Sequence, residues 1–149
     1  MRRLERDAQA IDVERSLAQL HSLLPLQPSS FRSGLIDRCE RLLVTALREF
    51  GPGDLRVMLG QQFYPETLVP LALPLLGEDP LLDAEYYPGD LLWSTLHQTT
   101  AFWQASPVML TRTRAVVSQA LLLAEHTGLE RLVREGIEDF KARTGQPFR

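Results

Sequence analysis

Three histidines are the residues of this chain that most readily bind metals or transfer protons: His21, His97 and His126. None of them has a second histidine four residues away, the spacing at which a helix presents two ligands to zinc. Ser94 and His97 are three residues apart and can share a helix face, but nothing nearby is placed to orient the imidazole for nucleophilic catalysis. We therefore interpret His97 and His126 as capping or packing residues.

Carboxylates and a single cysteine are the other groups with chemical potential. Glu78 with Asp79, and Asp83 with Glu85, form close pairs, but clustered acids on a loop are usually solvated, and nothing nearby indicates a substrate cleft or a metal. Cys39 falls on a predicted apolar stripe and is expected to be buried rather than reactive. The sequence also lacks a glycine-rich phosphate loop and a nucleophile elbow. We predict no catalytic residues, no metal and no cofactor, and a protein that is not an enzyme.

The strongest functional signal is a segment that mixes acidic and aromatic residues. Residues 83–93, DAEYYPGDLLW, place two tyrosines and a tryptophan among carboxylates. Aromatic rings within one sign of charge are typical of an interface with a basic protein, because the charge steers the encounter and the rings supply buried contact area. The alternative is that the rings pack the turn against the core. We predict a binding surface made of the acidic and aromatic residues of this region: Glu78, Asp79, Asp83, Glu85, Tyr86, Tyr87, Asp90 and Trp93.

The net charge of −3 is unevenly distributed along the 149 residues. Residues 57–111 contain six acidic residues and no Lys or Arg, whereas the flanking segments are slightly basic. Contacts with phosphates require Lys and Arg, so we expect no direct binding of nucleic acid here. The longest apolar run, residues 68–76, is far shorter than the roughly 20 residues that span a bilayer, and the start of the chain is too polar for a signal peptide. Since one cysteine forms no internal disulfide, we expect a cytoplasmic protein without a membrane contact.

Helical periodicity dominates the chain, and no segment alternates as a strand does. Pro70 and Pro74 each remove a backbone hydrogen bond, so they predict a kinked helix or two short pieces around them. We expect the helix over 113–126 to be central, because it is apolar on more than one face, and residues 144–149 to fray. The apolar spacing predicts helices over 13–24, 35–47, 54–62, 65–77, 89–98, 113–126 and 129–140, with a short turn at 102–103. The fold class is therefore predicted to be all-α, a single compact domain over residues 1–149 with about seven or eight mostly short helices.

Polar residues mark the predicted helix starts. Ser33 is placed to cap the helix over 35–47. The string Pro-Gly-Asp-Leu occurs twice, and in each copy the aspartate, Asp54 or Asp90, is predicted to accept hydrogen bonds from the free N–H groups of the following helix. The flanks of the two copies do not match and a third copy is absent, so we interpret them as one capping turn used twice rather than as a structural repeat.

Five short motifs follow one another in a fixed order: DLRVMLGQQ at 54–62, LVPLAL at 68–73, PL at 80–81, YYPGDLL at 86–92 and FW at 102–103. Together they resemble a family of immunity proteins from bacterial contact-dependent growth inhibition (CDI) systems. The family-like core covers about residues 53–107, and the predicted helix over 35–47 is compatible with the preceding segment of the family. The chain departs from the family pattern at Pro74, where a polar residue is usual, at Asp79, which replaces an Asn, and after Pro107.

The resemblance implies a small helical cytoplasmic protein that binds and neutralises the C-terminal toxin domain of a cognate effector. Toxins partnered with related helical immunity proteins include RNase A-like ribonucleases, so a basic nuclease blocked at its active site is the first expectation, with no homo-oligomer required. The alternative is a helical adaptor or regulatory module with an unrelated protein partner. We expect the charged surface around the motif residues to carry toxin specificity. The motif residues themselves are expected to define the fold, with Pro88, Gly89 and Asp90 in a turn and cap. Those at core spacing are Leu55, Met58, Leu59, Val69, Leu71, Leu73 and Leu92.

Overall fold

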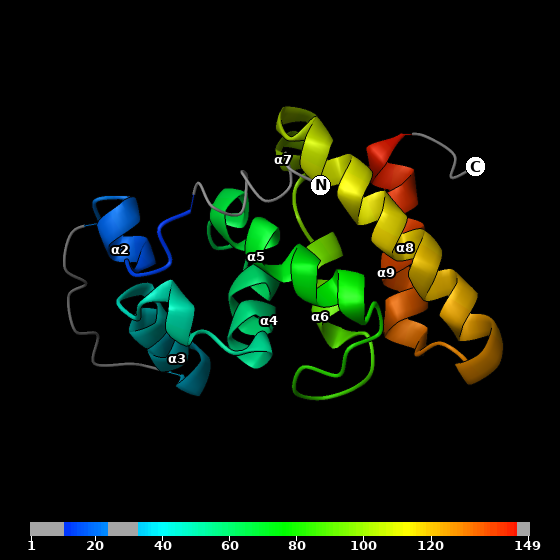
Figure 1. Cartoon of the computed structure of the whole chain (residues 1–149), viewed down its shortest axis with the longest axis horizontal. Helices are drawn as coiled ribbons and strands as arrows, with labels where there is room; N and C mark the ends of the chain where they lie inside the picture. Colours follow the sequence, from blue (N-terminus) through cyan, green and yellow to red (C-terminus); the bar gives the residue numbers. More distant parts are fainter. Residues whose placement is uncertain (1–10, 24–32, 146–149) are drawn as a thin grey trace.

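Helices account for all the regular secondary structure of residues 11–23 and 33–145, the residues that this computed structural model describes (Figure 1). Within these ranges one isolated β-bridge joins Asp83 to Pro88, and no helix is long and apolar enough to cross a membrane. The predicted all-α fold class is confirmed. The helices are α2 (Leu17–Leu20), α3 (Gly34–Leu43), the 3-10 helix η1 (Leu47–Glu49), α4 (Pro52–Gly60), α5 (Pro65–Glu78), α6 (Asp90–Leu96), α7 (Thr100–Ala105), α8 (Pro107–Thr127) and α9 (Arg131–Thr144).

The core lies where α4, α5 and α6 meet in the middle of the molecule, with α2 and α3 on one side and α7, α8 and α9 on the other (Figure 1). Met58, Leu68 and Leu92 are fully buried at this meeting point. Helix α9 packs on α6, and its Phe140 ring meets the Trp103 ring of α7 edge-on, with the ring centroids 5.3 Å apart. Each fully buried large apolar side chain contributes about 1.5–3 kcal/mol, so this packing is the main source of stability.

Helix α5 is a single helix although it contains Pro70 and Pro74, which excludes the predicted alternative of two short pieces. An interior proline destabilises a helix by about 3 kcal/mol. Burial of the apolar side chains of α5, at about 1.5–3 kcal/mol for each large one, is sufficient to offset that loss. The buried residues of the helix are Thr67, Leu68, Val69, Pro70, Ala72, Leu73 and Leu76.

Two serines begin the N-terminal helices. The Ser33 hydroxyl accepts a backbone N–H from the first turn of α3 at 3.1 Å, so the predicted cap is confirmed. Ser16 caps α2 and forms a reciprocal capping box with Gln19. Helix α2 covers only Leu17–Leu20, less than the predicted 13–24, and the predicted end of that helix lies outside the described residues.

Helix α3 ends at Leu43, before the predicted end at Leu47. The Leu47 N–H donates to the Arg15 carbonyl at 3.0 Å, and the Arg48 N–H donates to the Val13 carbonyl at 2.8 Å. These bonds join two segments that are distant in the sequence and take the place of helical bonds. Helix α3 is therefore shortened by a tertiary contact that helical periodicity does not contain.

Helix α8 begins at Pro107 rather than at 113, and it lies at the surface rather than at the centre as predicted. One face packs against α5 and α7. Leu122 and Leu123 are 54% and 42% exposed, so the apolar residues of the helix are not buried on all of its faces. Gly128 lies in the predicted break between the helices over 113–126 and 129–140, and it ends α8 with a positive φ of 79°. The buried residues of α8 are Thr113, Val116, Val117 and Ala120.

The last turn of α9 is bound to the end of α6. The Arg143 guanidinium donates hydrogen bonds to the carbonyls of Leu96, at 2.9 Å, and of Gln98. These carbonyls lie at the C-terminus of α6, where backbone acceptors have no partner within the helix. Thr144 is the last residue of α9, and the end of the predicted frayed segment, 146–149, lies outside the described residues.

Asp54 and Asp90 are not the N-caps of the helices that follow them, contrary to the prediction. Gly51 and Gly89 occupy the N-cap positions, so both aspartates already lie inside their helices. From there the Asp54 carboxylate reaches back to accept the Gly51 N–H at 2.9 Å. The Asp90 carboxylate also reaches back, into the loop before α6. In both Pro-Gly-Asp strings the aspartate carboxylate therefore accepts backbone N–H groups from residues that precede its helix.

Candidate functional site

The acidic loop, residues 79–89, joins α5 to α6 and carries most of the predicted binding residues. Its backbone is fixed by the Asp90 carboxylate, which is 2% exposed. This carboxylate accepts the N–H groups of Ala84, Glu85 and Tyr86 at 2.8, 3.0 and 2.9 Å. A buried carboxylate requires such bonds, because it has lost its hydration. Asp90 therefore shapes the loop and exposes almost no surface to a partner.

Gly89 closes the acidic loop against α9. Its N–H donates to the carbonyls of Leu81 and Leu82 at 3.1 and 3.2 Å, and its φ of 91° is a conformation that favours glycine. A Cβ at this position would lie 2.7 Å from Cγ2 of Val133, which is buried in α9. The loop and α9 are therefore in close contact at Gly89, and a side chain at this position would have to displace Val133.

Glu85 is paired within the chain rather than presented to a partner. Its Oε1 lies 2.7 Å from Arg38 Nη1, and its Oε2 lies 2.8 Å from Arg56 Nη2, while Arg38 also binds Asp54 at 3.1 Å. Burial by itself raises the pKa of Glu85, but the hydrogen bonds from Arg56 and Arg38 outweigh this effect and the pKa is lowered. The carboxylate is charged at neutral pH, and two arginines from α3 and α4 compensate that charge.

Tyr86 and Tyr87 have different environments. Tyr86 is 69% exposed, and the guanidinium carbon of Arg56 lies 4.6 Å from its ring centroid, a cation–π contact. Tyr87 is half-buried, and burial, followed by the charges of Asp90 and Glu130, raises the pKa of its hydroxyl against the opposing charge of Arg56. Tyr86 is therefore the aromatic side chain that the loop presents to solvent.

The Trp93 ring packs within the fold, which agrees with the alternative interpretation of the aromatic residues rather than with a fully exposed binding residue. Trp93 is half-buried, and its ring stacks on His97 with centroids 4.8 Å apart. A Cβ at Gly136 of α9 would lie 2.9 Å from Trp93 Cδ1. Trp93 therefore joins α6 to α9 and offers a partner only part of its ring.

Glu78, Asp79 and Asp83 are the exposed acids of the predicted surface. None of the three has an ion pair among the described residues, in contrast to Glu85. Their charges therefore remain available to a basic partner. Of the eight predicted binding residues, these three and Tyr86 are the ones that the structure places at the surface without burying them or engaging their charge.

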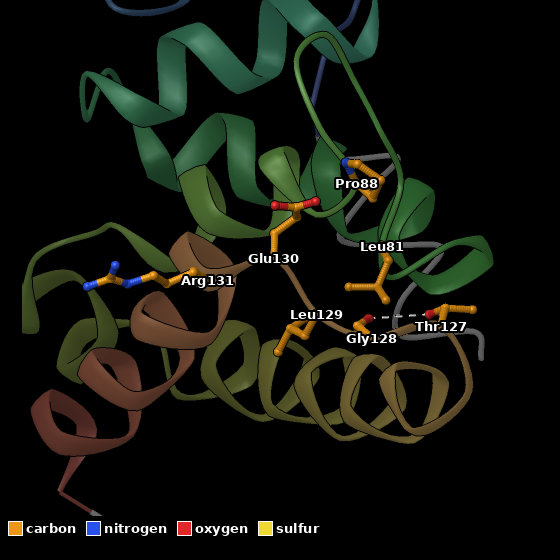
Figure 2. A pocket seen from close by; sticks show the side chains of 7 residues that line it. All are labelled: Leu81, Pro88, Thr127, Gly128, Leu129, Glu130 and Arg131. Carbon is orange, nitrogen blue, oxygen red and sulfur yellow. Dashed lines mark hydrogen bonds between the residues drawn. The ribbon is translucent and has the colours of Figure 1, made fainter.

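A cleft of about 460 Å³ lies between the acidic loop and the turn that joins α8 to α9. Figure 2 shows Leu81 directed toward Gly128, the Glu130 carboxylate directed toward the acidic loop, and Arg131 extending away from the loop. The lining residues are Leu81, Pro88, Thr127, Gly128, Leu129, Glu130 and Arg131.

Sequence reasoning missed the half of this cleft that comes from the α8–α9 turn. Leu129 was assigned only to a core stripe, and Glu130 was not singled out. The two residues lie far from the acidic segment in the sequence and reach it only because α9 packs on α6. The exposed Glu130, two residues after Gly128 at the end of α8, is a local signal for a surface turn, and it does not indicate what the turn faces.

The residues considered for catalysis or metal binding occupy buried, stacked or hydrogen-bonded positions. The Ser94 hydroxyl is buried and makes no hydrogen bond within the described part of the chain, while His97 stacks on Trp93. His21 binds Thr67 at 3.1 Å. Cys39 is 5% exposed, as predicted, and burial raises the pKa of its thiol against the charge of Arg38. The described residues contain no group of three or more His, Cys, Asp or Glu side chains that could hold a metal.

Comparison with known protein families finds a match over residues 21–112 to a family described as CDI immunity proteins. The matched residues include α3 to α7, the acidic loop and the first turns of α8. Leu129 and Glu130 of the cleft lie beyond it. No curated protein and no solved structure matches the chain.

Proposed function

This chain belongs to the family of CDI immunity proteins, and on that premise we propose that it binds and neutralises the toxin domain of a cognate CDI effector. It acts by stoichiometric binding rather than as an enzyme, without a cofactor. It acts in the cytoplasm, where the imported toxin meets its target. The match over more than half of the chain, including the whole acidic loop, is the observation that carries the proposal.

The acidic loop is the surface that we assign to the toxin. Asp83 and Tyr86 are exposed on a loop whose backbone is fixed by the buried Asp90 carboxylate. A loop that is ordered before binding loses less conformational entropy on association, so its contacts contribute more fully to affinity. The exposed acids steer a basic partner, and the tyrosine ring supplies contact area.

The partner is a basic nuclease, with an RNase A-like ribonuclease as the first candidate. A ribonuclease holds phosphates with Lys and Arg side chains, so a protein surface that presents carboxylates is complementary to the same residues. Glu78, Asp79 and Asp83 occupy this basic surface and exclude RNA from the active site. Inhibition is thus by occlusion, and one immunity protein blocks one toxin domain.

The direct test is expression of the chain together with the C-terminal domain of the CDI effector encoded beside it. We expect protection from growth arrest and a stable 1:1 complex on size-exclusion chromatography. Reversing Glu78 and Asp83 to Lys should lower the association rate constant about tenfold and weaken its dependence on salt. Glu125 and Glu138, exposed on α8 and α9, provide a matched control, and reversing both should leave the rate constant within about twofold of wild type.

Occlusion has its own test. A catalytically inactive toxin domain is loaded with a short fluorescent RNA, and the chain is titrated into the mixture while fluorescence anisotropy is followed. Occlusion predicts that the anisotropy falls to that of free RNA at one equivalent. A complex of toxin, RNA and immunity protein would show instead that the chain inhibits from outside the active site.

A further inference from the structure

We infer that the cleft between the acidic loop and the α8–α9 turn receives one basic side chain of the toxin, an Arg or a Lys, and that Glu130 pairs with it. This inference rests on the proposed function. It goes beyond it by assigning a toxin contact to residues that lie outside both the acidic segment and the family match. Specificity for the cognate toxin would then depend on the α8–α9 turn as well as on the loop.

The lining of the cleft fits such a side chain. Leu81, Pro88 and Leu129 provide apolar walls, and the Glu130 carboxylate lies at the edge near the acidic loop (Figure 2). Arg and Lys side chains have an apolar stem and a cationic tip, so they bury the stem along apolar surface while the charge remains near an acid or water. A purely apolar side chain would leave the carboxylate without a partner, and an acidic one would be repelled by it.

The charge around the cleft also favours a cation. Glu130 is exposed and has no ion pair among the residues that the structure describes. The basic residue of the lining, Arg131, extends away from the loop and pairs with Glu135 at 2.9 Å. Asp83, on the adjoining loop, is likewise exposed and without an ion pair in the described residues. Among the residues that line the cleft, the charge left without an ion pair in the described part of the chain is therefore negative.

Both walls of the cleft are held in place before a partner arrives. The loop wall is fixed by Gly89, which leaves no room for a Cβ against Val133. On the opposite wall the Thr127 hydroxyl bonds to the Leu123 carbonyl at 3.2 Å, and Gly128 ends α8. A cleft with fixed walls accepts a side chain without a further ordering penalty of its own.

The experiment compares Glu130→Lys and Glu130→Gln with wild type for binding to the same toxin domain. Glu130 makes no side-chain capping bond at the start of α9, so both variants are expected to fold, and a thermal melt confirms it. Glu138→Lys is the matched control, since it makes the same change of charge on an exposed face of α9 away from the cleft. We expect Glu130→Lys to weaken binding at least tenfold, Glu130→Gln at least threefold, and Glu138→Lys less than twofold.

The pairing is then located by combining Glu130→Gln with Ala substitutions of the basic residues of the toxin, one at a time. One of these Ala substitutions in the toxin should weaken binding to the wild-type chain but not to the Glu130→Gln variant. Unchanged binding by Glu130→Lys, equal weakening by Glu138→Lys, or the absence of any coupled basic residue would overturn the cleft assignment while the proposed function stands. A wild-type chain that neither binds nor protects would overturn both.

Discussion

Glu85 and Arg38 are 47 residues apart in the sequence, and their side chains form an ion pair of 2.7 Å that attaches the acidic loop to helix α3. Arg56 of α4 binds the second oxygen of the same carboxylate at 2.8 Å. Helices α3 and α4 therefore each supply an arginine that binds one oxygen of the Glu85 carboxylate. The same Arg56 guanidinium also contacts the Tyr86 ring, 4.6 Å from its centroid.

Replacing Glu85 by Gln should reduce the free energy of unfolding by about 1 kcal/mol at pH 7, since the ion pairs are partly exposed and screened. The pKa of Glu85 is lower in the folded chain than in the unfolded chain. Its stabilisation is therefore complete above the unfolded value of about 4.3 and is lost as the pH falls through the folded pKa. Urea denaturation at pH 7 and at pH 3 measures this difference, which should be smaller at the lower pH.

Asp83→Asn is the control for this prediction, because Asp83 is exposed in the loop and has no ion pair among the described residues. It should not alter the free energy of unfolding at either pH. Equal effects of the two substitutions would show that the ion pairs of Glu85 do not stabilise the fold.

Asp90→Ala should destabilise the protein by about 2–3 kcal/mol, because it removes a buried acceptor that serves three backbone N–H groups. The amides of Ala84, Glu85 and Tyr86 should also exchange with solvent much faster, which hydrogen exchange measures residue by residue. Asp83→Ala is the comparison: its side chain is exposed, and both stability and exchange should stay near wild type. Slow exchange in Asp90→Ala would contradict the role assigned to the buried carboxylate.

Gly89→Ala should reduce stability by about 2–4 kcal/mol, the sum of a left-handed φ and a methyl group in contact with Val133. Since the clash is with the Val133 side chain, Val133→Ala should cost less in the Gly89→Ala background than in wild type. Thermal or urea melts of the two single variants and the double variant measure this coupling. If the losses of stability in the two single variants simply add in the double variant, the cost of Gly89→Ala comes from its backbone conformation alone and not from contact with Val133.

Phe140→Ala should destabilise the protein by about 3–5 kcal/mol, because the ring is completely buried against Trp103. Leu132→Ala, on the same helix, should change stability by less than about 0.5 kcal/mol, since Leu132 is 52% exposed. Chemical denaturation of both variants tests whether α9, which lies beyond the family match, is an integral part of the core. If both substitutions reduce stability only slightly, α9 contributes little to the core.

Most elements were predictable from the residues alone. The helix starts at Ser33 and Pro65, the helix end at Gly128 and the buried position of Cys39 follow from local chemistry, which acts within one or two helical turns. Predictions that depended on distant partners were less accurate. Helix α3 ends early because of a contact with the segment near Arg15, and α8 is peripheral, with Leu122 and Leu123 exposed.

The candidate site shows the same division. The sequence by itself determined which segment is acidic and aromatic, and it carried the family resemblance that the match over residues 21–112 confirms. Only the tertiary structure decided which charges remain free: Glu85 is neutralised by arginines from other helices, Asp90 is buried, and Glu130 joins the loop across a cleft. Composition and spacing record the charges along a chain, whereas pairing and burial depend on distances in space, and packing of the whole fold sets those distances.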